Sequence, residues 1–265
     1  MGALLAIEWM KIKRYRTFWV LVGLFMLLLP VWNYEIASGV MKFGSDAKGG
    51  VNILSTAYSF PDVWANLGFW GSIFIIFISI LVIIITTNEF QYRTHRQNII
   101  DGWDRAAFFN AKILVVLMLS IAATLFLCLT GLAFGWSFSG SLAHAFDNFQ
   151  MVGYFFLLSL NYLGLAFFLA IVVRRSGLAI GLFLLYNNIV EHILKSVLNH
   201  FSDMPIGNFL PLQASDELLP FQLMQMMKSM MPASAISSTT YALVTVGWCA
   251  VYYFAGRAIL LRKDW

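Results

Sequence analysis

The chain has 265 residues, of which 60% are hydrophobic and only 11% are charged. Soluble domains carry about 25% charged residues, so this composition excludes an ordinary globular protein and predicts several membrane spans. The net charge of +4 arises from cations at the ends of apolar runs rather than in one basic patch, which argues against nucleic-acid binding.

The sequence offers no catalytic centre of its own. It contains no zinc-binding, serine-hydrolase or phosphate-binding glycine motif. Its apolar runs also leave no space for a separate catalytic domain of about 100–200 residues. Cys128 and Cys249 both fall inside apolar runs and are expected to be small core residues rather than a disulfide or a metal pair. We therefore expect no enzyme activity, metal or cofactor in this chain.

Residues 1–16 are predicted to form an N-terminal interfacial helix. They combine apolar side chains with a single glutamate and with the cations Lys11, Lys13, Arg14 and Arg16. Such a helix lies in the headgroup region, with its cations toward anionic lipids and Trp9 toward the acyl chains. The alternative is that this stretch simply extends the first span.

Six runs are long and apolar enough to cross a bilayer as helices. They are residues 17–37, 69–87, 113–136, 151–173, 177–198 and 241–261. The chain is therefore predicted to be an all-α polytopic membrane protein that forms a single transmembrane domain over residues 1–265. Segment 199–240 is expected to be an outer segment, with Ser215 accessible from that side. Its methionine-rich part, 220–234, suits a helix against the outer leaflet.

The distribution of cations predicts the orientation of the spans. One side of the predicted bundle carries Lys11, Lys13, Arg14, Arg16, Arg93, Arg96, Arg105, Lys112, Arg174, Arg175, Arg257, Arg262 and Lys263. The other side, or its vicinity, carries only Lys42, Lys48, Lys195 and Lys228. Because connections rich in Lys and Arg stay in the cytoplasm, we expect both termini and segment 88–112 to be cytoplasmic.

Segment 88–112, between the second and third spans, has the pattern of helix, turn and helix. Glu89 and Arg93 have the i,i+4 spacing of a favourable ion pair, and residues 90–100 can form one helix. Gly102 then permits a sharp turn, and Asp104 is placed to cap the helix that continues into the third span.

The charged side chains of this segment predict a docking surface for a soluble partner. Arg93 and Arg96 offer cationic contacts, and Arg105 with Asp101 would brace the turn at Gly102. The alternative is an ordinary cytoplasmic loop whose cations only fix the topology.

Polar residues inside the predicted spans form a second candidate site. The residues of this possible substrate path are Asn161, Asn187, Asn188 and Glu191. Polar and ionisable groups are costly in lipid and usually face a bundle interior or a watery cavity. Two interpretations stay open: a patch that lines a substrate path, or amides that hold helices together. Glu191 and Lys195 are four residues apart and are expected to pair.

The pattern of segment 88–112 resembles that of type-2 ABC-transporter permeases, in particular the bacterial six-span exporter subunits that include lantibiotic-immunity permeases. The matching residues are Glu89, Arg93-Thr94, Gly102, Arg105 and Lys112. The resemblance implies that this segment contains a coupling helix that docks on a separate ABC ATPase, which binds ATP and Mg²⁺. It also implies export across a bacterial plasma membrane, and a second permease copy or a sister permease in the complex.

Two other classes of protein remain as alternatives. A stand-alone channel or structural membrane protein would not need an organised cytoplasmic loop. A membrane-embedded enzyme would need paired carboxylates or a histidine cluster at one depth, and only Glu191 and His192 lie close together.

Overall fold

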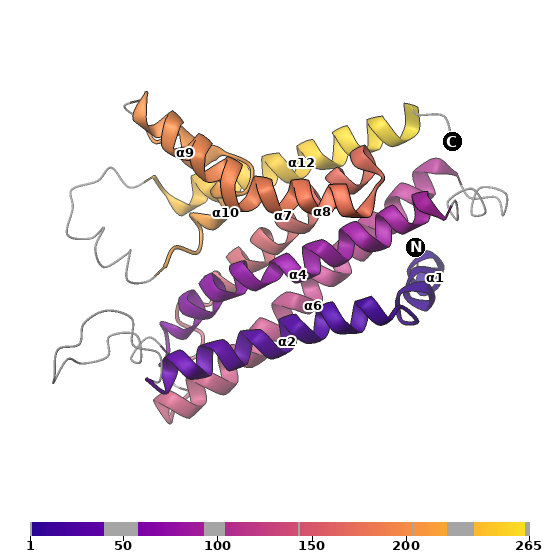
Figure 1. Cartoon of the computed structure of the whole chain (residues 1–265). Helices are drawn as coiled ribbons and strands as arrows, with labels where there is room; N and C mark the ends of the chain where they lie inside the picture. The colour runs from indigo at the N-terminus through magenta and orange to yellow at the C-terminus, as the bar shows by residue number, and fades with distance from the viewer. Residues whose placement is uncertain are drawn as a thin grey trace.

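The computed structural model describes residues 2–39, 58–92, 104–142, 144–202, 204–221 and 236–262. Within these ranges the protein is helical and has no strand. The helices are α1 (Gly2–Ile12), α2 (Arg16–Ala37), α4 (Val63–Gln91), α6 (Arg105–Ser139), α7 (Gln150–Val173), α8 (Ser176–Leu185), the π-helix η1 (Tyr186–Val190), α9 (Glu191–His200), the 3-10 helix η2 (Ile206–Phe209), α10 (Gln213–Asp216) and α12 (Ser238–Arg262) (Figure 1).

Six of these helical stretches are long and apolar enough to cross a membrane, and each contains one predicted span. The fifth is continuous from α8 through η1 to α9, over Ser176–His200. With about 1.5 Å of rise per residue, even the 22 residues of α2 measure about 33 Å, enough for the hydrocarbon core. The prediction of an all-α polytopic membrane protein with six spans is confirmed.

Two helices begin six or more residues before the predicted spans that they contain. Helix α4 begins at Val63 rather than at 69, and α6 begins at Arg105 rather than at 113. Apolar windows identify only the part of a helix that crosses lipid, whereas α6, with 35 residues, is about 52 Å long. Since α4 also continues to Gln91, the connection within segment 88–112 is shorter than predicted, and residues 93–103 of it lie outside the described ranges.

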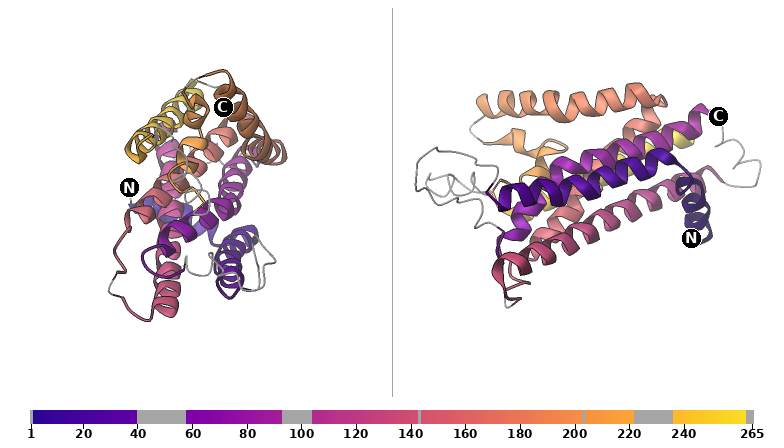
Figure 2. Two further views of the ribbon diagram at one scale, coloured as in Figure 1. Left: turned by 90° about the vertical axis from the view of Figure 1, so that its left-hand side faces the viewer. Right: turned by 60° about the horizontal axis from the view of Figure 1, so that its bottom comes forward.

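Helix α1 is a separate helix and not an extension of α2. It ends at Ile12, and the chain turns over the next three residues before α2 begins at Arg16. The alternative of one long first span is therefore wrong. In the views of Figure 2, α1 lies across the end of the bundle rather than along it.

The helix ends that were predicted to share one side of the membrane do lie at one end of the bundle. The start of α1 and the end of α12 are together at this end (Figure 1). Arg105 Nη1, at the start of α6, donates a hydrogen bond of 3.1 Å to Leu261 O of α12. Gln91 Nε2, at the end of α4, donates one of 3.3 Å to Ser176 Oγ of α8. We call this the α1 end, and the other the opposite end.

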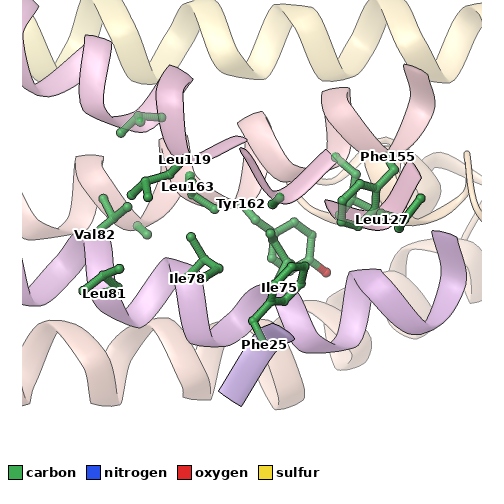
Figure 3. Packing of buried hydrophobic residues seen from close by; sticks show 14 of the residues in the cluster. Phe25, Ile75, Ile78, Leu81, Val82, Leu119, Leu127, Phe155, Tyr162 and Leu163 are labelled. Atoms are coloured by element: carbon green, nitrogen blue, oxygen red, sulfur yellow. The ribbon is translucent and has the colours of Figure 1, made fainter. Parts of the chain in front are cut away.

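Helix α4 is the centre of the core and packs against α2, α6 and α7. Figure 3 shows how its buried side chains meet those of α6 and α7. The labelled residues that meet are Ile75, Ile78, Leu81 and Val82 of α4, Leu119 and Leu127 of α6, and Phe155 and Leu163 of α7. Toward the opposite end, Gly131 of α6 lets Trp64 of α4 approach closely, because a Cβ at Gly131 would lie 2.4 Å from that ring. A larger residue would separate the two helices.

Residues 204–221, which we call the infolded segment, contain η2 and α10 and lie between α4, α7, α9 and α12. The second view in Figure 2 shows this segment between α4 and the continuous helix of α8 and α9. The expectation that Ser215 is accessible is wrong, since Ser215 is completely buried. The sequence has no long apolar run here, and burial depends instead on polar partners from other helices. The methionine-rich part from residue 222 lies outside the described ranges.

Candidate functional site

Four charged side chains from three helices meet at the α1 end. The Lys112 ammonium of α6 binds the Glu8 carboxylate of α1 and lies 2.7 Å from Glu89 Oε1 of α4. Lys11 Nζ of α1 lies 3.0 Å from Glu8 Oε1 and 3.4 Å from Glu89 Oε1. Lys112 and Glu8 are only 3% and 1% exposed, so these contacts are shielded from solvent. We call these four residues the ionic junction.

The charges of the ionic junction balance, with two carboxylates and two ammonium groups. Burial by itself raises the pKa of the Glu8 carboxyl, but the ammonium groups of Lys112 and Lys11 outweigh burial and hold that pKa below its ordinary value. Burial lowers the pKa of Lys11, and the carboxylates of Glu89 and Glu8 outweigh this effect and raise it. Glu8 and Lys11 therefore stay charged throughout the neutral range.

The ionic junction joins the helices on both sides of the predicted coupling segment. Glu89 lies in the last turn of α4, before that segment, and Lys112 lies in the third turn of α6, after it. Asn88 Nδ2 also donates a hydrogen bond to the Tyr15 hydroxyl, in the turn between α1 and α2. Helix α1 and both flanks of the segment are thus held as one unit.

Two of the six predicted coupling residues lie in the described ranges. Glu89 is buried within the ionic junction rather than on a docking surface. Arg105 begins α6 and ties it to α12 through Leu261 O. Asp104 occupies the predicted N-cap position, although its side chain makes no capping hydrogen bond. The other four, and with them the expected partners of Glu89 and Arg105, lie outside the described ranges: Arg93, Arg96, Asp101 and Gly102.

The predicted polar patch in the spans lies against the infolded segment. Asn161, at the middle of α7, donates hydrogen bonds of 2.7 Å to Pro211 O and 3.0 Å to Ser215 Oγ. From α12, Trp248 Nε1 donates to Phe209 O at 3.0 Å. These side chains satisfy polar groups of a segment that reaches the depth of the middle of α7. Asn161 therefore binds the infolded segment through its Nδ2, while its Oδ1 accepts a weak hydrogen bond of 3.9 Å from Cys249 Sγ of the transmembrane helix α12.

Glu191 is completely buried and also binds the infolded segment. Its Oε1 accepts hydrogen bonds from the backbone N–H groups of Leu212, at 2.6 Å, and Gln213, at 3.2 Å. The expected ion pair with Lys195 is wrong, because Lys195 Nζ lies instead 2.7 Å from Glu217 Oε1. The infolded segment supplies the backbone N–H donors for Glu191 and the Glu217 carboxylate for Lys195. The spacing of Glu191 and Lys195 within α9 could not reveal these partners.

Asn187 and Asn188 differ from the other two patch residues in that they line a cavity. They lie in η1, and π-helical turns occur frequently at functional sites. The cavity has a volume of about 770 Å³ and lies between α4, the η1–α9 stretch and the infolded segment. The predicted patch is therefore divided between residues that hold the infolded segment and residues that face open space.

Several residues of both clusters were not identified from the sequence as site residues. Glu8 and Lys11 belong to the ionic junction, and Tyr162 and Asp216 belong to the cavity. Glu8 had a usable signal, since it is the one acidic residue of a basic and apolar N-terminal stretch. Asp216 had none, because nothing in its neighbourhood in the sequence indicates that it packs against α7.

Comparison with known protein families gives a match that covers most of the chain. A family model described as "ABC-2 family transporter protein" matches residues 4–190, which include α2, α4, α6, α7, α8, η1 and all of α1 except its first two residues. Comparison with curated proteins finds no match to this chain.

Proposed function

Because the chain belongs to the ABC-2 transporter protein family, and is thus a multi-pass permease component of an ABC transporter, we propose that it couples ATP hydrolysis by a separate ATPase to export of a substrate. The ATPase subunits carry the ATP and Mg²⁺, and this chain provides the transmembrane path. A second permease copy or a sister permease completes the complex. The membrane is the plasma membrane of a bacterium.

The observation that supports coupling best is the ionic junction. A force on the connection between α4 and α6 acts on both of its flanks, and Glu89 and Lys112 join these flanks to each other and to α1. Buried ion pairs hold their partners in one geometry, since separating them exposes uncompensated charge at a cost of about 3–5 kcal/mol. The three helices would therefore move together when an ATPase docks on the connection.

Helix α4 offers the route from the docking connection to the substrate path. Glu89 of the ionic junction and Ile76 of the cavity lie on this helix, thirteen residues apart, which corresponds to about 20 Å along its axis. A continuous helix transmits a displacement over this distance without a flexible joint. Movement of α4 against α9 would then change the shape of the cavity.

The cation distribution supports a cytoplasmic α1 end. Most Lys and Arg residues lie near this end, where the family resemblance places the ATPase. Cysteine labelling tests this orientation in a variant that lacks the two native cysteines. A cysteine at the exposed Ser141, at the opposite end, should react in intact cells with a membrane-impermeant maleimide, and one at the exposed Lys13 should react only after lysis. Labelling of position 13 in intact cells would overturn the orientation.

Co-purification tests the proposed function itself. The tagged chain, solubilised from its native membrane in a mild detergent, should retain an ABC ATPase whose hydrolysis is inhibited by vanadate. Mass spectrometry identifies the partner by its nucleotide-binding motifs. If the chain purifies alone and supports substrate movement in ATP-free liposomes, it is a channel, and the proposal is wrong.

A further inference from the structure

The cavity at the opposite end has one apolar wall. Phe69, Ile73 and Ile76 of α4 line it, together with Phe221 of the infolded segment. The rings of Phe69 and Phe221 lie with centroids 4.8 Å apart and form a continuous aromatic surface. Ile73 is 46% exposed although it lies on the helix at the centre of the core. This wall suits the apolar body of a ligand.

The facing wall is polar and carries an excess negative charge. The Lys195 ammonium is neutralised by Glu217, at 2.7 Å, and also donates to Gln213 Oε1 at 2.7 Å. Asp216 is largely buried but not completely, and its Oδ1 accepts a hydrogen bond of 2.8 Å from the Tyr162 hydroxyl. In the described part of the chain, no Lys, Arg or His nitrogen lies within ion-pair distance of Asp216. With Asp216 and Glu217 counted as ionised and histidine as neutral, the residues that line the cavity have a formal net charge of about −1.

The helices that flank the cavity come together toward the α1 end. There α8 packs against α4, and Gln91 of α4 donates a hydrogen bond to Ser176 of α8. The Arg174 guanidinium, in the turn before α8, covers the Phe90 ring of α4 at 5.0 Å from its centroid. Beyond α8, the helix continues as η1 and α9 and diverges from α4 toward the opposite end (Figure 1). A ligand would therefore reach the cavity from the opposite half of the bundle.

We propose that this cavity binds an amphipathic cation, with its ammonium-like group against the Asp216 carboxylate and its apolar body against the Phe69 and Phe221 rings. The inference rests on the proposed function, since it names the substrate class of that transport path. The ligand supplies the positive charge that the cavity lacks, and the aromatic rings favour cations at short range. The amides of Asn187 and Asn188, on the η1 side of the same cavity, accept hydrogen bonds from a primary or secondary ammonium.

A matched pair of lipophilic ions tests the proposal on the permease alone. Tetraphenylphosphonium and tetraphenylborate have nearly the same shape and opposite charge. In dodecylmaltoside, which has no charge and no ammonium group, the purified chain should bind radiolabelled tetraphenylphosphonium at least about tenfold more tightly than tetraphenylborate. Equal binding of the two ions, or no binding of the cation, overturns the proposal. Neither result affects the proposed function, because the assay contains no ATPase.

Two substitutions with controls assign the binding to this cavity. Asp216→Asn should weaken tetraphenylphosphonium binding about tenfold or more, because its amide still accepts the Tyr162 hydrogen bond but has no charge. Asp147→Asn is the control, since that carboxylate lies outside the cavity and is 62% exposed. Unchanged affinity in Asp216→Asn overturns the proposal.

A second variant keeps the test decisive if Asp216→Asn does not fold. Ile73→Lys places a cation in the apolar wall and should abolish tetraphenylphosphonium binding by repulsion. Ile121→Lys adds the same charge on α6 at a similarly exposed site, 43% against 46%, and should bind like the wild type. Retained binding in Ile73→Lys overturns the proposal.

Lipid competition identifies the source of the cation. Phosphatidylethanolamine carries an ammonium headgroup, whereas phosphatidylglycerol does not. Competition by the former alone supports the cavity with a lipid headgroup as its occupant. Absence of competition by both lipids supports it with a soluble amphipathic cation. Competition by phosphatidylglycerol equal to that by phosphatidylethanolamine overturns a site selective for ammonium groups.

Discussion

The two ends of α4 lie in polar environments of opposite character. At the α1 end, Glu89 is packed into a group of two carboxylates and two ammonium groups whose charges balance. At the opposite end, α4 faces a cavity of about 770 Å³ in which no cation of the described residues lies within ion-pair distance of the Asp216 carboxylate. A balanced group whose members are mostly buried fixes its helices relative to one another, whereas an open cavity with excess charge favours a ligand. Helix α4 thus connects the ionic junction to the cavity.

The largest effect is expected from a substitution that disrupts the ionic junction. Lys112→Met removes the cation between Glu8 and Glu89 and leaves two buried carboxylates with Lys11 alone, at a cost of about 3–5 kcal/mol in the free energy of unfolding. The variant should show a lower melting temperature in detergent and a lower ATP-dependent transport rate. Lys13→Met, at an exposed position two residues after Lys11, is the matched control and should behave like the wild type. Normal stability and transport in Lys112→Met would contradict a structural role for the junction.

The next largest effect is expected from a substitution that releases the infolded segment, which lines the cavity, from α9. Glu191→Ala leaves the buried N–H groups of Leu212 and Gln213 without their acceptor, which costs about 1–3 kcal/mol. The infolded segment should loosen, so a cysteine at the completely buried Ala214 should become reactive to maleimide in that background.

Glu191→Gln is the matched control for this prediction, because its side-chain oxygen still accepts the two hydrogen bonds. A cysteine at Ala214 should therefore stay protected in Glu191→Gln. Equal protection in both variants would show that Glu191 does not hold the segment.

The sign of the pH dependence can be predicted for the stability that the ionic junction contributes. Because the pKa of Glu8 lies below its ordinary value of 4.5, this carboxylate contributes stability above that pH, and the contribution disappears as the pH falls through the lowered pKa. The pKa of Lys11 lies above 10.5, so its contribution disappears only at higher pH. The contribution of Glu8 and Lys11 to the melting temperature should therefore be nearly constant between these limits and fall on the acid side, and Glu8→Gln should reduce that acid-side fall. An acid-side fall of the same size in Glu8→Gln would contradict the assignment.

The smallest effect is expected from the hydrogen bond that connects α4, beside the ionic junction, to the turn before α2. Tyr15→Phe removes the hydrogen bond that Asn88 donates to the tyrosine hydroxyl, at an exposed position. Such a bond contributes about 0.5–1.5 kcal/mol. The melting temperature should fall slightly, with transport unchanged. A loss as large as that in Lys112→Met would show that this hydrogen bond, rather than the charges, is the main attachment of α1.

The sequence was sufficient to predict the six spans, because long apolar runs and the absence of water in the bilayer leave helices as the available solution. Its charges and turn residues also predict a docking segment, which stays a prediction because residues 93–103 lie outside the described ranges. It did not predict the ionic junction, since Glu8 and Lys112 are 104 residues apart and only the packing of α1 across the bundle brings them together.

The infolded segment shows a second limit of sequence reasoning. The polar, proline-rich sequence of 199–240 predicts an outer segment with Ser215 accessible, yet residues 204–221 are inserted among the helices and Ser215 is buried. Their backbone groups are bound by Asn161, Glu191 and Trp248, which lie on three different helices. Those residues were visible as polar groups in apolar runs, but their partners depend on tertiary structure. The expected Glu191–Lys195 pair failed for the same reason.

The most direct test of the central claim is the coupling ratio, the number of substrate molecules exported per ATP hydrolysed by the co-purified ATPase in liposomes. Arg96→Glu and Gly102→Val change the predicted docking segment, and Ser141→Ala at the opposite end is the control. Reversing the charge of one cationic contact costs about 2–5 kcal/mol at an interface. The account predicts a fall of at least about tenfold in the coupling ratio or in ATPase retention for both variants, and none for Ser141→Ala. Wild-type retention and coupling in both variants would contradict it.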